Sequence, residues 1–121
     1  MSDNRRIDDW TKGAEAIVYQ SCTACGARQY FRRSFCAACG APDPVDKHAS
    51  GDGVVYATSL VVRAATPEAR AHVPYNIVLV DTAEGFRVMA HGDNDLKIGD
   101  RVSAQYRRFT DRLVPYFTRT K

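Results

Sequence analysis

The sequence contains no apolar run of the roughly 18 residues that a membrane-spanning helix needs. It also lacks two glycine-rich signatures of nucleotide-binding loops, Walker A and Gly-x-Gly-x-x-Gly. The N-terminus, MSDNRRIDDW, carries neither the apolar core nor the cleavage site of a secretory signal. We therefore expect a cytoplasmic protein with no membrane association, built on neither of these nucleotide-binding motifs.

Residues that could form a catalytic group are few and scattered. The three histidines, His48, His72 and His91, lie far apart, and we interpret each as a surface or packing residue. Ser59 and Ser103 lie in strand-like runs without the nucleophile-elbow pattern. Since no acid, base and nucleophile come together in the sequence, we expect a chain that is not an enzyme on its own.

The composition is that of an ordinary globular chain. Of the 121 residues, 45% are apolar and 26% are charged, which supports one domain or two very small ones. The formal net charge is +3, but four thiolates around one zinc ion would reduce it to about +1. Residues 101–121 hold six basic residues against Asp111 alone, whereas residues 81–100 hold five acidic residues against two basic ones. Net charge therefore gives little support to a polyanionic partner, although the C-terminal residues are locally basic.

The four cysteines follow the spacing Cys22-x2-Cys25-x10-Cys36-x2-Cys39. Two sulfurs separated by two residues in a tight turn can face one metal ion, and two such turns supply four ligands at tetrahedral corners. Each pair is followed by a glycine, Gly26 or Gly40, which lets the backbone fold under the sulfurs and present N–H donors to them. The spacing therefore predicts a metal site with four cysteine ligands.

The metal predicted for this site is a structural zinc ion. Four protein ligands leave no coordination position for water, so the ion would stabilise a small module rather than catalyse a reaction. Iron in a rubredoxin-like site is the main alternative, because a tetrahedral all-sulfur site also suits iron. Disulfides are disfavoured by the reducing compartment expected above.

The segment between the two cysteine pairs combines aromatic and basic residues, Tyr30, Phe31, Arg32 and Arg33. In one interpretation the aromatic rings pack against the rest of the protein and the arginines are solvated. In the other, arginines beside aromatic rings form a site for a phosphate-bearing or nucleotide-like group. The sequence leaves both interpretations open.

The N-terminal part of the chain indicates three short units before the strands begin. A short helix is expected over residues 3–14, because Ile7, Trp10 and Ala14 recur on one helical face. Residues 41–50 contain two prolines and predict a linker. We therefore divide the chain into residues 1–21 (N-terminal helix and lead-in strand), 22–40 (zinc ribbon), 41–50 (linker) and 51–121 (strand-rich domain).

From Gly51 onward the sequence is rich in β-branched residues and turn signals. Two turns are predicted, at residues 82–85 and 110–112. A five-stranded antiparallel sheet protects its edges by curling into a small barrel, so we predict a mainly β fold. The five predicted strands cover residues 53–63, 75–80, 86–91, 101–109 and 113–120.

Several segments, in order along nearly the whole chain, resemble one known family. They are Trp10, Cys22-x2-Cys25-Gly26, the aromatic-arginine segment before Cys36-x2-Cys39-Gly40, Gly51-x-Gly53-x-Val55-Tyr56-x-Thr58-Ser59, Pro74-Tyr75, Glu84-Gly85 and Leu96 to Val102. Together they are similar to the zinc-ribbon/OB-fold proteins catalogued as domain of unknown function 35, which are associated with acyl-CoA. The resemblance implies a rubredoxin-like zinc ribbon packed on a five-stranded OB-fold barrel.

The resemblance also implies a function. Members of this family are commonly non-catalytic small subunits of thiolase-type enzymes, and less often of hydratases or aldolases that act on acyl-CoA. The chain is then expected to form a hetero-oligomer, to stabilise the enzyme and to help hold the CoA thioester. The candidate contacts to CoA are Tyr30, Phe31, Arg32, Arg33, Tyr75 and Asn76. For Tyr75, simple core packing is an equal alternative.

A single-stranded nucleic-acid-binding module is the alternative function, since zinc ribbons and OB barrels both occur in that role. The C-terminal strands interleave aromatic rings with positive charge, at Tyr106, Arg107, Arg108, Phe109, Tyr116 and Phe117. The low corrected net charge and the acidic segment that precedes these strands count against it.

Overall fold

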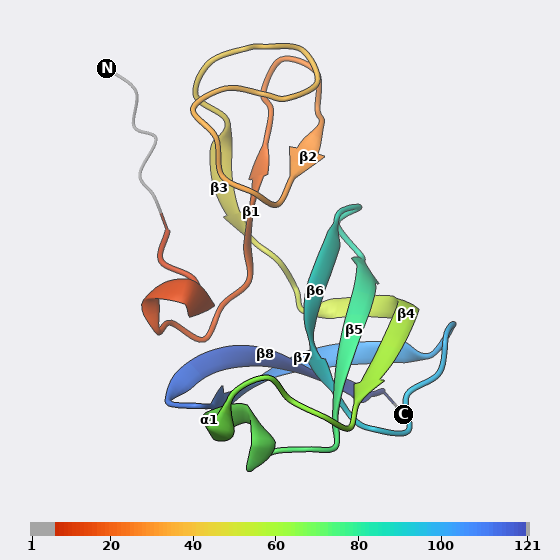
Figure 1. Ribbon diagram of the computed structural model, residues 1–121. Coiled ribbons are helices and arrows are strands. Elements are labelled where there is room, and N and C mark those ends of the chain that lie inside the picture. Colours follow the sequence, from red (N-terminus) through yellow and green to blue (C-terminus); the bar gives the residue numbers. More distant parts are fainter. Residues whose placement is uncertain (1–6, 121) are drawn as a thin grey trace.

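The computed structural model describes residues 7–120 and shows two parts, a three-stranded sheet and a closed five-stranded barrel (Figure 1). The small sheet has the strand order β2-β1-β3 and the barrel has the order β4-β5-β6-β8-β7. In chain order the elements are η1 (Trp10–Lys12), β1 (Val18–Ser21), β2 (Arg28–Gln29), β3 (Val45–His48), β4 (Asp52–Val61), α1 (Pro67–Arg70), β5 (Tyr75–Thr82), β6 (Arg87–Gly92), β7 (Arg101–Phe109) and β8 (Arg112–Arg119). The predicted mainly β fold with a C-terminal barrel is confirmed.

The N-terminal helix is shorter than predicted. Of residues 3–14, those up to residue 6 lie outside the described residues, and the rest form only the single 3-10 turn η1. The Asp9 side chain accepts a hydrogen bond from the backbone N–H of Thr11 at 3.0 Å, which starts the turn. Gly13 ends it with a φ of 87°, a conformation that most other residues avoid.

The stretch predicted as a linker contains a strand. β3 pairs with β1 along its whole length, from Val18 opposite His48 to Ser21 opposite Val45. The prolines on which the linker prediction rested precede β3 and do not interrupt it. The side chain of Asp46 is buried and contacts Arg32 and Gln20. These contacts fix β3 in the three-stranded sheet, which we call the ribbon together with its cysteine turns.

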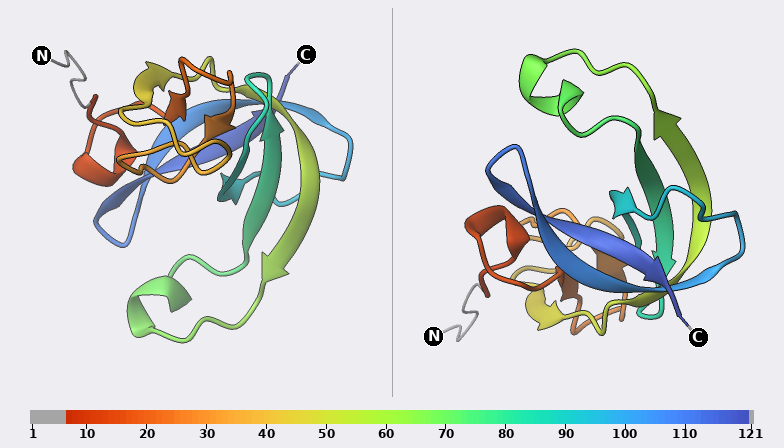
Figure 2. Two further views of the ribbon diagram at one scale, coloured as in Figure 1. Left: turned by 90° about the horizontal axis from the view of Figure 1, so that it is seen from above. Right: turned by 90° about the horizontal axis from the view of Figure 1, so that it is seen from below.

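The five barrel strands begin and end within two residues of their predicted bounds. Four of the five strand pairs are antiparallel, as expected, whereas β6 and β8 pair in parallel through His91 and Tyr116 and close the barrel. The long connection between β4 and β5 carries α1 and projects from the barrel on the side away from the ribbon (Figures 1 and 2).

The ribbon and the barrel share one apolar core. Val55, Val78 and Val80 point into the barrel, and Tyr19 from β1 belongs to the same buried cluster. Phe86, at the turn between β5 and β6, stacks on the ring of Tyr19 with centroids 5.0 Å apart. This shared core fixes the ribbon against one end of the barrel.

Candidate functional site

The four cysteine side chains converge at the tip of the ribbon. Their Sγ atoms all lie within 4.8 Å of one another, with 3.6 Å between Cys22 and Cys39 and 3.7 Å between Cys25 and Cys36. Zinc–sulfur bonds of about 2.3 Å at tetrahedral angles separate the sulfurs by about 3.8 Å. The donor set and its spacing therefore fit a tetrahedral zinc ion.

Each cysteine pair sits in a turn of the same construction. The N–H of Gly26 donates to the carbonyl of Cys22 at 3.0 Å, and the N–H of Gly40 donates to the carbonyl of Cys36 at 2.8 Å. Both glycines have left-handed backbones, with φ values of 77° and 79°. The predicted role of these glycines in folding the backbone under the sulfurs agrees with this geometry.

Backbone N–H groups point at two of the sulfurs. The N–H groups of Ala24 and Cys25 lie 3.3 and 3.4 Å from Sγ of Cys22, and that of Ala38 lies 3.4 Å from Sγ of Cys36. Hydrogen bonds from Cys25 and Ala24 lower the pKa of Cys22 to about 6. These donors favour the thiolate form of Cys22, which is the form that binds metal ions.

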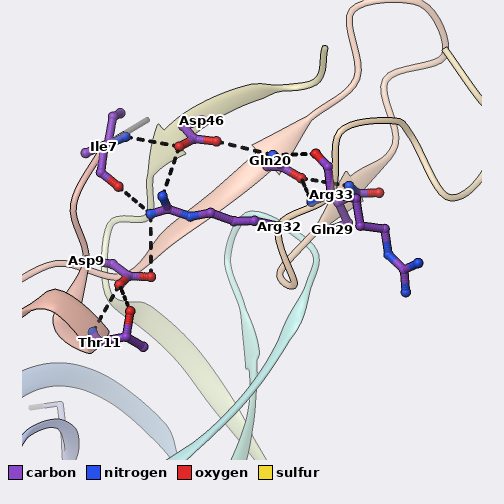
Figure 3. A network of polar contacts seen from close by, with 8 residues as sticks. All are labelled: Ile7, Asp9, Thr11, Gln20, Gln29, Arg32, Arg33 and Asp46. Carbon is purple, nitrogen blue, oxygen red and sulfur yellow. Dashed lines mark hydrogen bonds and ion pairs between the residues drawn. The ribbon is translucent and has the colours of Figure 1, made fainter. Parts of the chain in front are cut away.

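Arg32, one of the four candidate residues of the ribbon, is occupied by internal partners. Its guanidinium lies 3.3 Å from a carboxylate oxygen of Asp46 and 3.5 Å from one of Asp9, and it donates to the carbonyl of Ile7 (Figure 3). The Arg32 side chain is 19% exposed and that of Asp46 is 2% exposed. The positive charge of Arg32 therefore links the N-terminal segment to β3. Because Asp9 and Asp46 already balance this charge, Arg32 offers little attraction to an anionic ligand.

The other three ribbon candidates differ in their surroundings. Tyr30 accepts a hydrogen bond from the indole N–H of Trp10 at 2.8 Å and stacks on Phe86, and burial raises its pKa. Phe31 is 76% exposed. Arg33 is bound to the sheet through its backbone, and its exposed side chain points away from the polar network (Figure 3).

Tyr75 and Asn76 lie at the opposite end of β5 from the ribbon. The strand runs from Tyr75 to Thr82, a distance of about 23 Å at 3.3 Å per residue. Asn76 is buried, and its Nδ2 donates to the carbonyl of Asp93 at 2.9 Å, while its Oδ1 has no hydrogen-bond partner among residues 7–120. The six residues predicted to contact CoA therefore form two separate groups.

Tyr75 borders a cavity of about 490 Å³ at the end of the barrel that carries α1. One wall is aromatic: the Phe109 ring lies 4.9 Å from Tyr75, 4.5 Å from His72 and 4.4 Å from His91, between ring centroids. Burial, and then the neighbouring His72, lower the pKa of His91, so its ring is neutral at pH 7.

Two arginines and a carboxylate complete this cavity. The Arg107 guanidinium lies 3.8 Å above the Tyr116 ring, and the Tyr116 hydroxyl donates to Oδ1 of Asp93 at 2.9 Å. Arg108 lines the same cavity. Within residues 7–120, neither arginine forms an ion pair with a carboxylate. We call this site, defined by the aromatic wall, the two arginines, Tyr116 and Asp93, the barrel pocket.

Comparison with known protein families finds a matching family model for each half of the chain. The model of the ChsH2 rubredoxin-like zinc ribbon domain matches residues 10–45, and that of the ChsH2 C-terminal OB-fold domain matches residues 46–107. The chain belongs to the ChsH2 (DUF35) family. This confirms the resemblance stated from the sequence motifs, and it makes the four-cysteine cluster of the chain a zinc-ribbon site.

Two solved structures are similar in fold to this ChsH2-family chain. A chain of an Ltp2-ChsH2 (DUF35) aldolase is 25% identical, with a TM-score of 0.76 and 91% of each chain covered. A DUF35 protein of unknown function from Sulfolobus solfataricus is 16% identical, with a TM-score of 0.58, and the match covers 87% of this chain and 76% of that one. No curated protein matches the sequence.

Sequence reasoning missed part of the barrel pocket of this ChsH2-family chain. It named Arg107, Arg108, Phe109 and Tyr116, which do line the pocket, but as members of a stacking surface for nucleic acid. Two other members of that set lie elsewhere, since Phe117 is fully buried and Tyr106 packs against the core. His72 and His91 were interpreted as surface or packing residues, and Asp93 was given no role. The fold brings all three to the cavity beside Tyr75. In residues 7–120 there is no helix long and apolar enough to cross a membrane.

Proposed function

We propose that this protein is a non-catalytic small subunit of a hetero-oligomeric enzyme that acts on acyl-CoA thioesters. The observation that carries the proposal is the match to the ChsH2-containing aldolase, which extends over 91% of both chains at 25% identity. Because the match covers 91% of each chain, the role of this chain is best compared with that of the matched subunit as a whole.

The distribution of nucleophiles supports a non-catalytic role. All four cysteines are gathered in the zinc-ribbon site, where four sulfur ligands leave no open coordination position. The neutral ring of His91 lies among aromatic rings, with no cysteine left for it to activate. The structure thus offers no assembled acid, base and nucleophile in residues 7–120.

Exposed apolar side chains support a partner subunit. Tyr56 on β4, Met89 on β6 and Ile98 in the loop before β7 are 49%, 64% and 71% exposed. Exposed large apolar side chains of this kind can contribute to a protein–protein contact when a partner covers them. A partner that covers them would remove apolar area from water and stabilise the complex.

The partner class is the finer part of the proposal. The sequence resemblance predicted a thiolase-type enzyme, whereas the solved relative belongs to an aldolase. We take an aldolase that cleaves a carbon–carbon bond of an acyl-CoA as the first candidate and a thiolase-type enzyme as the second. We also propose that the complex is cytoplasmic, because the four cysteines form a zinc-ribbon site and not disulfides.

The experiment is affinity purification of the tagged full chain from its native host, followed by mass spectrometry and light scattering. The expected result is one catalytic subunit in stoichiometric amount, whose sequence distinguishes an aldolase from a thiolase. The tag alone is the control. Recovery of the chain without a partner, or with nucleic acid released by high salt, would contradict the proposal and favour the nucleic-acid-binding alternative.

A further inference from the structure

The second half of β4 is a strand edge without a neighbouring strand on one side. Within residues 7–120, β4 pairs with β5 as far as Val61, but it pairs with β7 only at its N-terminal end. The loop before β7 then covers Val55, whose N–H donates to the carbonyl of Asp100 at 2.9 Å and whose carbonyl accepts from Gly99 at 2.8 Å. Beyond this loop, no strand among the described residues lies beside residues 57–61 on the side away from β5 (Figure 2).

The exposure of the side chains on this edge has the same cause. Thr58 lies opposite Val78 and Leu60 lies opposite Asn76 in the pairing with β5, so each pair shares the face of the sheet that points into the barrel. Val78 is fully buried and Asn76 is 2% exposed, whereas Leu60 is 50% exposed. A leucine on the inward face is therefore left half in water, because no strand within residues 7–120 lies beside it.

The sequence of this edge lacks the charges and prolines that usually keep other strands away from an exposed edge. From Tyr56 to Val62 it reads YATSLVV, with no charged residue and no proline. The outer strand of the ribbon, β3, differs, because the exposed Lys47 lies near its centre. Pairing with β5 is regular from Ala57 to Val61, so alternate backbone N–H and C=O groups of this segment point outward. Such an uncharged, regular edge can accept one more strand.

Each end of this edge carries a large apolar side chain that water still reaches. Ile98 precedes Gly99, which is bound to Val55 at the start of the edge, and Ile98 is 71% exposed. Val62 follows the end of the edge and is 64% exposed. When two copies of one edge pair antiparallel, the start of one meets the end of the other. Ile98 of one copy then approaches Val62 of the other at both ends of the paired segment.

The residues along the edge are also complementary to a second copy of themselves. In antiparallel pairing centred on Ser59, this residue lies opposite its own copy, Thr58 lies opposite Leu60, and Ala57 lies opposite Val61. No charge lies opposite a like charge in this register, and no charged group has to leave water. A second copy of this chain therefore matches the edge in backbone, in charge and at both apolar ends.

We propose that two copies of this chain associate through antiparallel pairing of residues 57–61 of β4, which joins the two barrels into one sheet across a two-fold axis. The pairing satisfies backbone groups on both edges and covers Leu60, Val62 and Ile98. Because the paired segment is short, the dimer is reversible, with a dissociation constant in the micromolar range. Met89 lies on β6, two strands away, so it stays available to a catalytic subunit. The dimer forms with or without that subunit.

The test is analytical ultracentrifugation of the full-length zinc-loaded chain from about 1 to about 300 μM, where we expect monomer and dimer in reversible exchange. Ser59→Lys and Ser59→Asp each place like charges opposite one another at the centre of the pairing, so each should weaken dimerisation at least about tenfold. An equal mixture of the two variants should restore the dimer, because Lys then lies opposite Asp. Gln105→Lys adds the same charge at an exposed position of β7, away from this edge, and should dimerise as the wild type does.

Amide hydrogen exchange locates the contact in the same samples. Amides of residues 57–62 should exchange more slowly at the highest concentration than at the lowest, whereas those of β6 should not change. A wild-type chain that stays monomeric throughout, a dimer that both charge variants leave intact, or variants that fail to pair when mixed would each overturn the proposal. A monomeric wild type that loses its catalytic subunit on Ser59→Lys would also overturn it, and would assign this edge to that subunit.

Discussion

Two segments of this chain combine arginines with aromatic rings, and they are used in opposite ways. In the ribbon, Arg32 lies between Asp9 and Asp46 and is 19% exposed. In the barrel, Arg107 and Arg108 are exposed and form no ion pair within residues 7–120. The same residue types therefore stabilise the fold in one region and line an open cavity in the other.

The difference follows from what each region can bury. The ribbon has three short strands, so it depends on a metal ion and on polar contacts to fix its loops. The barrel strands supply most of the shared apolar core, including Val78, Val88 and Phe117, so the barrel depends less on surface charges for its stability. A basic or aromatic motif is therefore informative about function only when the residues that contact it within the fold are known.

The largest effect expected is that of removing the metal. Structural zinc supplies roughly 10–16 kcal/mol in zinc-finger peptides, so chelation should unfold residues 18–48 while the barrel amides stay protected. Hydrogen exchange of the chain with and without a chelator measures this, and Cys36→Ala should give the same pattern without one. Loss of protection in the barrel before the ribbon would contradict the contrast between the two regions.

The second effect is that of breaking the ribbon's ion-pair network. Arg32→Gln leaves the carboxylate of Asp46, whose side chain is 2% exposed, without its cation. Removing one partner of a buried pair costs about 3–5 kcal/mol, measured as the free energy of unfolding in urea. The neighbouring Arg33→Gln is the matched control, because that side chain is exposed and should change stability by less than about 0.5 kcal/mol. Equal effects of both variants would show that Arg32 is not the anchor of the network.

In the barrel, the corresponding substitution should leave stability nearly unchanged. Arg107→Gln/Arg108→Gln removes two exposed charges that form no ion pair within residues 7–120, so the free energy of unfolding should change by less than about 1 kcal/mol. The same urea titration measures it beside Arg32→Gln. A loss as large as that of the ribbon variant would mean that these arginines are structural too.

The smallest effect is a pH dependence at the aromatic wall. Burial lowers the pKa of His91 below its usual 6.5, so the folded state disfavours the protonated ring. The unfolded state then takes up the proton first, and this contribution to stability is present above pH 6.5 and is lost as the pH falls below it. His91→Phe should flatten the decline in stability between pH 7.5 and 5.5, whereas His48→Gln, at an exposed position of β3, should not. Identical pH profiles for wild type and His91→Phe would contradict this.

The parts of the fold with strong local signals could be predicted from the sequence. Regular cysteine spacing gave the metal site, and β-branched runs bounded by turn residues placed the barrel strands within two residues. The N-terminal spacing of Ile7, Trp10 and Ala14 was misleading, since a single capped turn replaces the helix. β3 was missed because it follows two prolines and its central residue, Asp46, is charged.

The candidate site was harder to predict, because its residues meet only through strand pairing. Tyr75 and His91 lie on neighbouring strands and Phe109 comes from a third, so no local spacing indicates their contact. Tyr75 and Asn76 are adjacent in sequence but face opposite sides of β5, Asn76 toward the interior and Tyr75 toward the pocket. Side chains alternate between the two faces of a strand, and the sequence did not reveal which face of β5 borders the cavity.

The most direct test of the subunit assignment is turnover of an acyl-CoA thioester by three preparations: this chain alone, the co-purified catalytic subunit alone, and the complex reconstituted from both. We predict no turnover by this chain, a reduced rate for the catalytic subunit, and full activity for the complex. Turnover by the isolated chain, abolished by a single substitution in the barrel pocket, would contradict the account and identify the chain as an enzyme.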